Sequence, residues 1–512
     1  MKYLSVFCAL VAFGQFNEAF CQGGFLDASF GNGGIIQQDL GPGEQAGSSV
    51  TMQPDGKILV GGYGQPGLFT DFMLMRYLPN GTLDLSFGTD GVVYTDIIGF
   101  TENSCIVLVQ EDGKIVIAGS YFSDGGTSTD IALARYTTDG VLDPTFDSDG
   151  IVLSNLPSVA NTIYDGLIQA DGKIILAGSG GMDSSEKDYL VLRYNTDGTL
   201  DYTFDSDGRV FVNITTVKDI CYSIKQQSDG KFIMAGTTGH LSGANVTVVK
   251  INEDGSMDNT FGTGGIVTTA YGSGADYGTG IAIQSDGKYV VCGNTYNGTS
   301  FDFMLLRYNE DGSLDATFDG DGALTYDLAG LNDSWEDVHI MDDDKIVVSG
   351  YAEQVTGYDF VVGRYNADAT LDMGFGTNGL VTTDIVGSMD KAYSSVIQSD
   401  GKIVLCGYAD NGVDYDVVLA RYYLYGTLSS ETENNSETGI AISPNPTKGL
   451  VHLVYGNHED VGRVLLTSSD GKKVMDFSTN DNQVDLSDLP AGIYYVQVFY
   501  QNTFYSTKIL RN

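Results

Sequence analysis

The chain has 512 residues and a formal net charge of −41 at pH 7. A chain this acidic repels phosphate backbones, so its composition argues against nucleic acid as a partner and favours divalent cations or neutral ligands such as glycans. It contains 67 glycines and many tyrosines and phenylalanines, and long runs with helical periodicity are absent. This composition predicts many short strands joined by glycine turns.

The first 21 residues have the features of a secretory signal peptide. Lys2 gives a positive start, and the apolar run that follows is too short to span a bilayer. Small residues precede a predicted cleavage point between Cys21 and Gln22. The alternative, a lipoprotein, would need a small residue just before Cys21, where Phe20 stands. No later segment is apolar enough to cross a membrane, so we expect no transmembrane segment in the mature chain.

Three motifs then recur, with 57 to 59 residues between like positions. The first is a turn followed by an apolar run, as in "SDGKIVLCG", and its lysines are Lys57, Lys114, Lys173, Lys231, Lys288, Lys345 and Lys402. The second ends in Arg-Tyr or a variant of it, as in "DVVLARY". The third is Leu-Asp-x-x-Phe or a close variant, and it begins at Leu26, Leu83, Leu142, Leu200, Met257, Leu314 and Leu371.

Each repeat is predicted to form four antiparallel strands. The first strand leads to the Asp-Gly turn, the second is the apolar run, the third ends in Arg-Tyr, and the fourth contains Leu-Asp-x-x-Phe. Asp-Gly between apolar runs is a strong hairpin signal, and apolar residues on both faces indicate a strand covered by two neighbouring sheets. These features are typical of a β-propeller blade, and the alternative is an open solenoid of small sheets.

The order of the motifs favours a closed ring. The first Leu-Asp-x-x-Phe, within Phe25 to Ile35, precedes the first lysine motif, whereas the last unit, which ends near Tyr422, lacks its own copy. The N-terminal strand is therefore predicted to complete the seventh blade, which removes the free edges of the ring. We predict an all-β fold, with a seven-bladed β-propeller over residues 24–428.

The sixth repeat departs from the pattern at two turn glycines. Asp344 replaces the first, and aspartate tolerates the left-handed conformation that such a turn needs. Ala369 replaces the second, and alanine tolerates this conformation less well. We therefore expect an altered turn at Ala369.

The repeat resembles the delta-60 repeat family through "QxDGK(I/V)xxxG", "RY" and "LDxxFGxxG", as this chain carries them. The resemblance covers roughly Gly24 to Thr427. It implies propeller-like β structure in a secreted bacterial protein. It implies no shared catalytic activity, so it informs the fold more than the function.

An acidic linker over residues 429–439 precedes alternating strands over 440–512, which predict a small β-sandwich. This last segment resembles the type A C-terminal sorting domain of the type IX secretion system of Bacteroidota. The matching residues are Pro444, Asn445, Pro446, Gly449, Gly492 and Lys508. The resemblance implies that the type IX machinery is a partner, that the protein crosses the outer membrane, and that this domain is then removed. The product would be secreted or on the cell surface. The alternative is an ordinary domain that the mature protein keeps.

Several residues are candidates for chemistry or binding. The seven Arg-Tyr positions are predicted to be structural, pairing with the motif aspartate or with a backbone carbonyl; an anion-binding ring is the alternative. Three Asp-x-Asp-Gly turns could gather carboxylates around Ca²⁺, although other repeats manage without them, so a purely structural turn is the alternative. Their carboxylates are Asp147, Asp149, Asp205, Asp207, Asp319 and Asp321. No other cofactor is expected.

Trp335, the single tryptophan, is a candidate for stacking on a sugar, with packing in the core as the alternative. The loops between the second and third strands vary most from repeat to repeat and should cluster on one rim, where binding sites commonly lie. Four cysteines outside the signal peptide lie in strand-like apolar runs and are predicted to be buried thiols, not a disulfide framework or metal cluster: Cys105, Cys221, Cys292 and Cys406.

These features favour a secreted or surface-displayed binding scaffold for a glycan or a protein. Motifs for a nucleophile or a transition metal are absent from the sequence, whereas carboxylates are too abundant for an acid/base pair to be located. Whether the protein is an enzyme therefore stays open, and a non-enzymatic role is favoured. The alternatives are an extracellular enzyme that acts on polysaccharide through rim carboxylates, and a calcium-stabilised adhesive protein.

Overall fold

The computed structural model describes two parts of the chain. The first is residues 23–425, without 98–101, 124–127, 155, 157–159, 182–185, 240–242 and 273. The second is 441–443, 450–454, 463–468, 473–477, 483–487, 489–490, 492–500 and 503–511. The predicted signal peptide and linker lie outside the described residues. Residues Gln22–Tyr425 form one compact unit, and the C-terminal strands belong to another.

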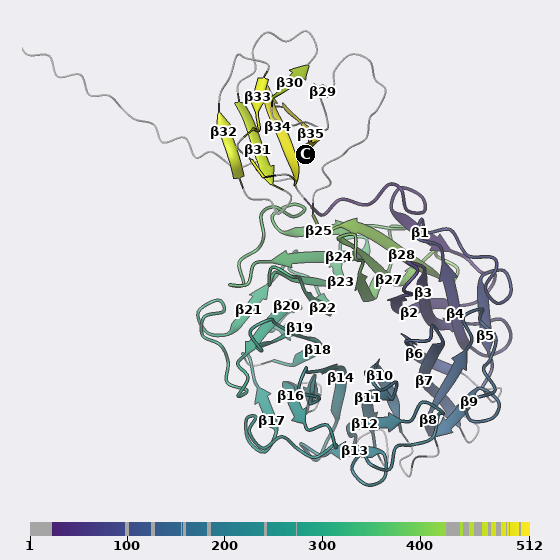
Figure 1. Cartoon of the computed structure of the whole chain (residues 1–512). Helices are drawn as coiled ribbons and strands as arrows, with labels where there is room; N and C mark the ends of the chain where they lie inside the picture. The colour runs from purple at the N-terminus through teal and green to yellow at the C-terminus, as the bar shows by residue number, and fades with distance from the viewer. Residues whose placement is uncertain are drawn as a thin grey trace, which may run out of the picture. The chain divides into compact units, whose positions relative to one another are not determined.

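Within the described part of the first unit, the strands form seven four-stranded antiparallel sheets around a central axis (Figure 1). We number these sheets blades 1 to 7. Blade 1 comprises β2 (Gln45–Met52), β3 (Ile58–Gly64), β4 (Asp71–Tyr77) and β5 (Val92–Thr95). Blade 2 comprises β6 (Glu102–Val109), β7 (Ile115–Ser123), β8 (Ser128–Tyr136) and β9 (Ile151–Ser154). Blade 3 comprises β10 (Thr162–Ile168), β11 (Ile174–Gly180), β12 (Asp188–Tyr194) and β13 (Arg209–Val212).

The remaining blades follow the same order. Blade 4 comprises β14 (Asp219–Gln226), β15 (Phe232–Thr238), β16 (Asn245–Ile251) and β17 (Ile266–Thr269). Blade 5 comprises β18 (Asp276–Ile283), β19 (Tyr289–Tyr296), β20 (Phe301–Tyr308) and β21 (Ala323–Tyr326). Blade 6 comprises β22 (Asp333–Ile340), β23 (Ile346–Gln354), β24 (Gly357–Tyr365) and β25 (Leu380–Thr383). Blade 7 comprises β26 (Asp390–Ile397), β27 (Lys402–Asp410), β28 (Tyr415–Tyr423) and β1 (Ile35–Gln38). The predicted all-β, seven-bladed propeller is confirmed.

The core of the propeller lies between neighbouring blades. The second and third strands of each blade are buried on both faces, as their apolar sequence predicts. At one junction, Val404 and Cys406 of blade 7 pack against Val60 and Met75 of blade 1. The first strand of each blade is innermost and contacts the first strands of both neighbours (Figure 1). The four cysteines are buried free thiols.

Blade 7 takes its outermost strand from the start of the chain. β1 pairs antiparallel with β28, with Ile35 opposite Ala420 and Gln38 opposite Val417. The sequence placed the fourth strand on the Leu-Asp-x-x-Phe motif itself, and this was wrong. The motif forms a turn, in which Leu26 makes a single bridge to Tyr422, and the strand begins only after the glycines that follow. The motif aspartate causes the turn because its Oδ1 accepts hydrogen bonds from the residue two positions later.

The Arg-Tyr and Leu-Asp-x-x-Phe motifs meet in every blade. In blade 1, Arg76 Nε lies 2.9 Å from Asp84 Oδ2, its guanidinium packs 4.3 Å from the centroid of the Phe87 ring, and it donates to a carbonyl of blade 2. Burial alone would raise the pKa of Asp84, but hydrogen bonds from Ser86 and the charges of Arg76 and Lys57 lower it to about 2. The arginines are therefore structural and not free to bind an anion. The equivalent pairs are Arg135–Asp143, Arg193–Asp201, Lys250–Asp258, Arg307–Asp315, Arg364–Asp372 and Arg421–Asp27.

The two unusual turns of blade 6 keep the geometry of the other blades. Asp344 has a φ of 60°, as expected for aspartate in the left-handed region. Ala369 also has a positive φ, 78°, and its N–H donates to the Asn366 carbonyl at 3.1 Å, as Gly312 does to Asn309 in blade 5. The expected alteration of the turn at Ala369 is wrong, because the surrounding hydrogen bonds hold alanine in the strained conformation.

The described strands of the second unit form two sheets. One contains β29 (Ala441–Ser443), β30 (Leu450–Val454) and β33 (Gln483–Asp485), and the other contains β32 (Lys473–Phe477), β31 (Arg463–Ser468), β34 (Gly492–Tyr500) and β35 (Thr503–Arg511). Val451, Val484, Leu466 and Val496 belong to one buried cluster that draws on both sheets. The β-sandwich predicted for this unit stays a prediction. Among all residues that the structure describes, no helix has the length and apolar character needed to span a bilayer.

Candidate functional site

The ends of the second strands and the starts of the third strands lie on one rim of the propeller, which we call the loop rim because the variable loops of the sequence connect them. The start of each first strand pairs with the end of the second strand, as Asp390 does with Ala409. The start of the third strand pairs there too, as Asp359 does with Ala352. First-strand starts, second-strand ends and third-strand starts therefore share this rim.

Every innermost strand carries a β-bulge near the loop rim. The register shifts by one residue at Ser48, Ser104, Tyr164, Tyr222, Thr279, Glu336 and Tyr393. In six blades, a glycine of the second strand faces the bulge, and a Cβ atom there would overlap the carbonyl oxygen two residues before the bulged residue. These glycines are Gly62, Gly178, Gly236, Gly293, Gly350 and Gly407. The glycine that ends the lysine motif is thus required by the bulge, which inserts one extra residue into the innermost strand of each blade.

The residue after the bulge joins the innermost strands to one another. Asp165 Oδ2 accepts a hydrogen bond from the N–H of Ile224 in the next blade, at 2.9 Å. Across the 7/1 junction, Ser394 Oγ accepts from the N–H of Val50 at 3.2 Å. Innermost strands are sheet edges, so these bonds satisfy N–H groups that would otherwise lack partners. Hydrogen bonds between blades therefore link the innermost strands in which the bulged residues lie.

Five tyrosines of blades 6 and 7 form a continuous cluster at the loop rim, which we call the tyrosine cluster: Tyr351, Tyr358, Tyr393, Tyr408 and Tyr415. The ring centroids are 5.4 Å apart for Tyr351–Tyr358, 6.3 Å for Tyr351–Tyr393, 5.8 Å for Tyr393–Tyr408 and 4.6 Å for Tyr408–Tyr415. Tyr393, a bulged residue, is the most open of them, with 38% of its surface exposed. The cluster presents aromatic rings and hydroxyl groups side by side.

Glu336 and Lys391 bring charge to this cluster. Burial raises the pKa of Glu336 to about 7, although a hydrogen bond from Ser334 and the charge of Lys391 act to lower this pKa. Burial also lowers the pKa of Lys391, whose Nζ lies 4.3 Å from the Tyr351 ring centroid and 4.1 Å from that of Tyr358. The site therefore combines aromatic faces, a cation held over two rings and a carboxyl group that titrates near neutral pH.

Trp335 does not contribute to this surface. It is fully buried and stacks on Phe303 of blade 5, with the ring centroids 3.8 Å apart. Its ring is consequently unable to contact a sugar, and the sequence-based stacking hypothesis is corrected to the packing alternative. Trp335 directly precedes the bulged Glu336, and its side chain belongs to the buried cluster between blades 5 and 6.

The Asp-x-Asp-Gly turns connect neighbouring blades. Their first aspartates, Asp147, Asp205 and Asp319, have φ values of 45°, 46° and 46°. The N–H groups of Asp147 and Asp205 donate to carbonyls of the next blade, and Gly88 and Gly262 occupy the same role elsewhere. The second aspartates, Asp149, Asp207 and Asp321, accept a backbone N–H two residues later at 2.9 to 3.0 Å. Within the described residues, none of the six belongs to a group of three ligands close enough to share a cation. Calcium binding at these turns stays a prediction.

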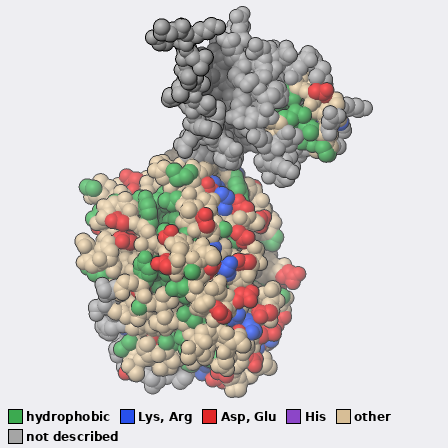
Figure 2. Space-filling view, turned by 90° about the vertical axis from the view of Figure 1, so that its left-hand side faces the viewer, with side chains coloured by type: hydrophobic (Ala, Val, Ile, Leu, Met, Phe, Trp, Pro, Cys, Tyr) green, Lys and Arg blue, Asp and Glu red, His purple; other side chains and the backbone are tan. Residues whose placement is uncertain are grey.

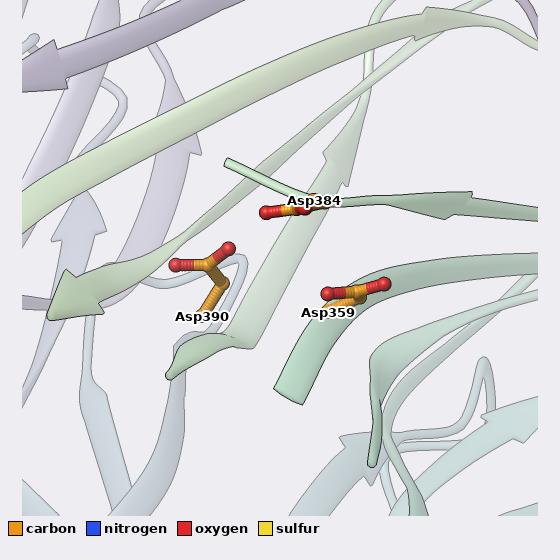
Figure 3. A group of neighbouring side chains, drawn as sticks. All are labelled: Asp359, Asp384 and Asp390. Atoms are coloured by element: carbon orange, nitrogen blue, oxygen red, sulfur yellow. The ribbon is translucent and has the colours of Figure 1, made fainter. Parts of the chain in front are cut away.

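Such a group does occur at the loop rim, between blades 6 and 7. It consists of Asp359, Asp384 and Asp390, whose side chains come from three different segments (Figure 3). The sequence analysis missed it because its members belong to two repeats. The available signal was a second set with the same spacing, Asp302, Asp327 and Asp333, placed 57 residues earlier.

Most of the predicted sorting residues lie outside the described residues: Pro444, Asn445, Pro446 and Gly449. Gly492 begins β34, and Lys508 lies in β35 opposite Tyr495.

The surface of the propeller is acidic, as the net charge of −41 predicts. Figure 2 shows Asp and Glu side chains scattered over one side of it, with fewer Lys and Arg among them.

Comparisons with known families match both units. A domain of unknown function that forms a β-propeller (DUF5122) matches residues 53–87, 110–146, 169–204, 227–261, 284–318, 342–375 and 398–428. A secretion system C-terminal sorting domain matches residues 441–512. A search of curated proteins found no match.

Solved structures resemble the chain at low sequence identity. PorZ, a surface component of the type-IX secretion system of Porphyromonas gingivalis, is 10% identical, with a TM-score of 0.39 over 92% of this chain and 60% of that one. A PL25 ulvan lyase is 10% identical, with a TM-score of 0.41 over 76% of this chain and 96% of the lyase. An α-L-arabinofuranosidase of Fusarium graminearum is 11% identical, with a TM-score of 0.41 over 80% and 99%.

Proposed function

Because this chain belongs to the DUF5122 β-propeller family and ends in a type IX secretion sorting domain, we propose that it is a surface or secreted propeller that binds a glycan through its tyrosine cluster. The sorting domain supports export to the cell surface or the medium. The finer steps, which are cleavage before Gln22, translocation and removal of residues 440–512, are part of the proposal. The proposal also includes a propeller domain over residues 24–428, a linker over residues 429–439, and the type IX secretion machinery as a partner.

The observation that carries the glycan proposal is the row of tyrosine rings at the loop rim of blades 6 and 7, in which Tyr393 lies on an innermost strand. Sugar rings have apolar faces that stack on aromatic side chains, and their hydroxyl groups need hydrogen-bond partners nearby. Burial raises the pKa of Tyr351 and Tyr393, so both phenols stay protonated and able to donate at neutral pH. The acidic surface disfavours polyanionic ligands, so the proposal names a neutral glycan.

The first test measures binding by the full-length protein on an array of neutral glycans, followed by calorimetry with a glycan that binds. Tyr393→Ala should weaken binding about tenfold, because it removes the most exposed ring of the cluster. The matched control is Tyr202→Ala, a tyrosine with 68% exposure in a motif turn at the opposite rim, which should bind as wild type. A uniform loss in both variants, or no binding to any neutral glycan, would refute the proposal.

A second candidate function rests on Glu336. A carboxyl group with a pKa near 7 is half protonated at neutral pH and suits general acid or base catalysis. If the protein cleaves polysaccharide, the Glu336→Gln variant should release sugar ends at least 100-fold more slowly while binding glycan within a few-fold of wild type. Measuring new reducing ends from a panel of polysaccharides decides the matter. Equal rates of release by wild type and Glu336→Gln, or no release at all, would reject catalysis by Glu336 and leave binding as the only proposed function.

A further inference from the structure

Three aspartates converge at the loop rim where blade 6 meets blade 7. Asp359 lies in β24, Asp384 follows β25, and Asp390 is the first residue of β26 (Figure 3). One carboxylate oxygen from each lies within 4.8 Å of the others. Three negative charges at this separation repel one another strongly unless a cation lies between them.

Asp390 supplies an observation that is independent of this clustering. It is fully buried, and its Oδ2 accepts hydrogen bonds from the N–H groups of Ile385 at 2.7 Å and Val386 at 3.2 Å. Its Oδ1 is also buried but has no hydrogen-bond partner in the structure. A buried carboxylate oxygen without a hydrogen-bond partner costs free energy, so a ligand bound to this atom would stabilise the protein.

The 3/4 junction satisfies the equivalent groups with protein donors. Between blades 3 and 4, Asn213 takes the place of Asp384 and donates to Asp188 Oδ1 at 2.9 Å. The equivalent of Asp390 there is Asp219, whose Oδ1 accepts from Thr215 Oγ1 at 2.7 Å. The 6/7 junction has a third carboxylate in place of the asparagine, and no hydroxyl group donates to Asp390 Oδ1. At the 5/6 junction Asp333 Oδ1 also lacks a hydrogen-bond partner, but within the described residues Asp302, Asp327 and Asp333 do not form a group close enough to share a cation.

The geometry points to a Ca²⁺ site formed by Asp359, Asp384 and Asp390. Calcium prefers hard oxygen ligands and takes six to eight of them in flexible arrangements, so three carboxylates leave room for water. Asp384 is exposed, which gives the ion a path from solvent. Magnesium demands stricter octahedral geometry and dehydrates reluctantly, so it should bind more weakly. The ion would tie β24 to the link between blades 6 and 7 and so fix Tyr358, the residue before Asp359.

The test titrates CaCl2 into full-length protein freed of metal with EDTA, and follows both heat of binding and thermal unfolding. The structure predicts saturable binding that raises the unfolding temperature, with MgCl2 at least tenfold weaker. Asp384→Asn, which copies the arrangement at Asn213, should weaken calcium binding at least tenfold. Because it also removes a repelling charge, the variant without metal should unfold at the same or a higher temperature than wild type. This opposite effect on binding and stability would not arise from a damaged fold.

Two control variants make the test specific. Asp39→Asn changes the exposed aspartate that follows β1, where Gln45 stands in place of the third carboxylate. Asp321→Asn changes an Asp-x-Asp-Gly turn while keeping the oxygen that accepts the Ala323 N–H. Both should leave calcium binding at Asp359, Asp384 and Asp390 as in wild type. The site is refuted if wild type does not bind calcium, if Asp384→Asn binds it equally well, or if either control loses as much affinity as Asp384→Asn.

Discussion

A chain that lacks residues 23–38 should lose the cooperative unfolding of the whole propeller. The deletion removes β1, leaves β28 as an open edge and takes away Phe30, which is fully buried against blades 7 and 1. It also leaves Arg421, only 4% exposed, without the carboxylate of Asp27. Breaking one buried ion pair costs about 3 to 5 kcal/mol, and the lost strand and core residue add to this. Their sum approaches the total stability of a typical domain.

Chemical denaturation of the truncated chain, followed by tyrosine fluorescence and circular dichroism, measures this effect. We expect a broad transition at much lower denaturant than for wild type. A synthetic peptide of residues 23–38, added in excess, should restore part of the lost stability by pairing with β28, whereas a scrambled peptide should not. An unfolding midpoint equal to that of wild type would show that the N-terminal strand does not hold the ring closed.

Substitution Asp27→Asn should have the largest effect of any single charge change in the propeller. Asp27 is fully buried, and its Oδ2 lies 2.7 Å from Arg421 Nη2 and 3.2 Å from Lys402 Nζ. Asparagine keeps the Oδ1 that accepts from Ser29 but turns an amide toward two cations. The free energy of unfolding at pH 7 should fall by about 3 to 5 kcal/mol. The matched control is Asp400→Asn, which removes an exposed partner of the same Lys402 and should cost less than about 1 kcal/mol.

The effect of Asp27→Asn should depend on pH in a defined direction. Burial alone would raise the pKa of Asp27, but hydrogen bonds from Ser29 and Tyr423 and the charge of Arg421 lower it well below its usual value. A lowered folded-state pKa gives stability above about pH 4, the unfolded value, that is lost as the pH falls through the folded value. Unfolding measured from pH 7 to pH 3 should therefore show the gap between wild type and Asp27→Asn narrowing below pH 4. A gap that stays constant over this range would contradict the ion-pair explanation.

The architecture of the propeller could be predicted because its repeats carry physical requirements in the same positions. Glycine turns, two-faced apolar runs and the Arg-Asp pair are needed once per blade, so each appears as a motif. The prediction misplaced the fourth strand because the repeated residues of Leu-Asp-x-x-Phe form the turn and the ion pair. The strand itself, such as Ile35–Gln38, is short and varied in sequence. Ala369 could not be predicted, since only the surrounding hydrogen bonds show that the turn survives.

The candidate sites were harder to predict because they depend on differences between repeats. A bulge shifts the alternation of the two faces of a strand by one position, so the sequence did not show that Tyr393 is exposed while Trp335 is buried. The prediction that the variable loops share a rim needed only strand order, and the described strand ends that flank these loops do lie on one rim. The carboxylates of Asp359, Asp384 and Asp390 come together across a junction, which comparison within one repeat cannot reveal.

The closure of blade 7 has a consequence for the timing of folding. The hydroxyl of Tyr423 donates to Asp27 across a separation of 396 residues, at 2.9 Å. Synthesis proceeds from the N-terminus, so β1 must remain without its partner until nearly the whole propeller has been made. A chain that ends anywhere before β28 leaves a ring with an exposed strand edge, which is open to pairing with other chains. Closure thus acts as a check on completeness, because only a chain that extends through β28 can reach its most stable state.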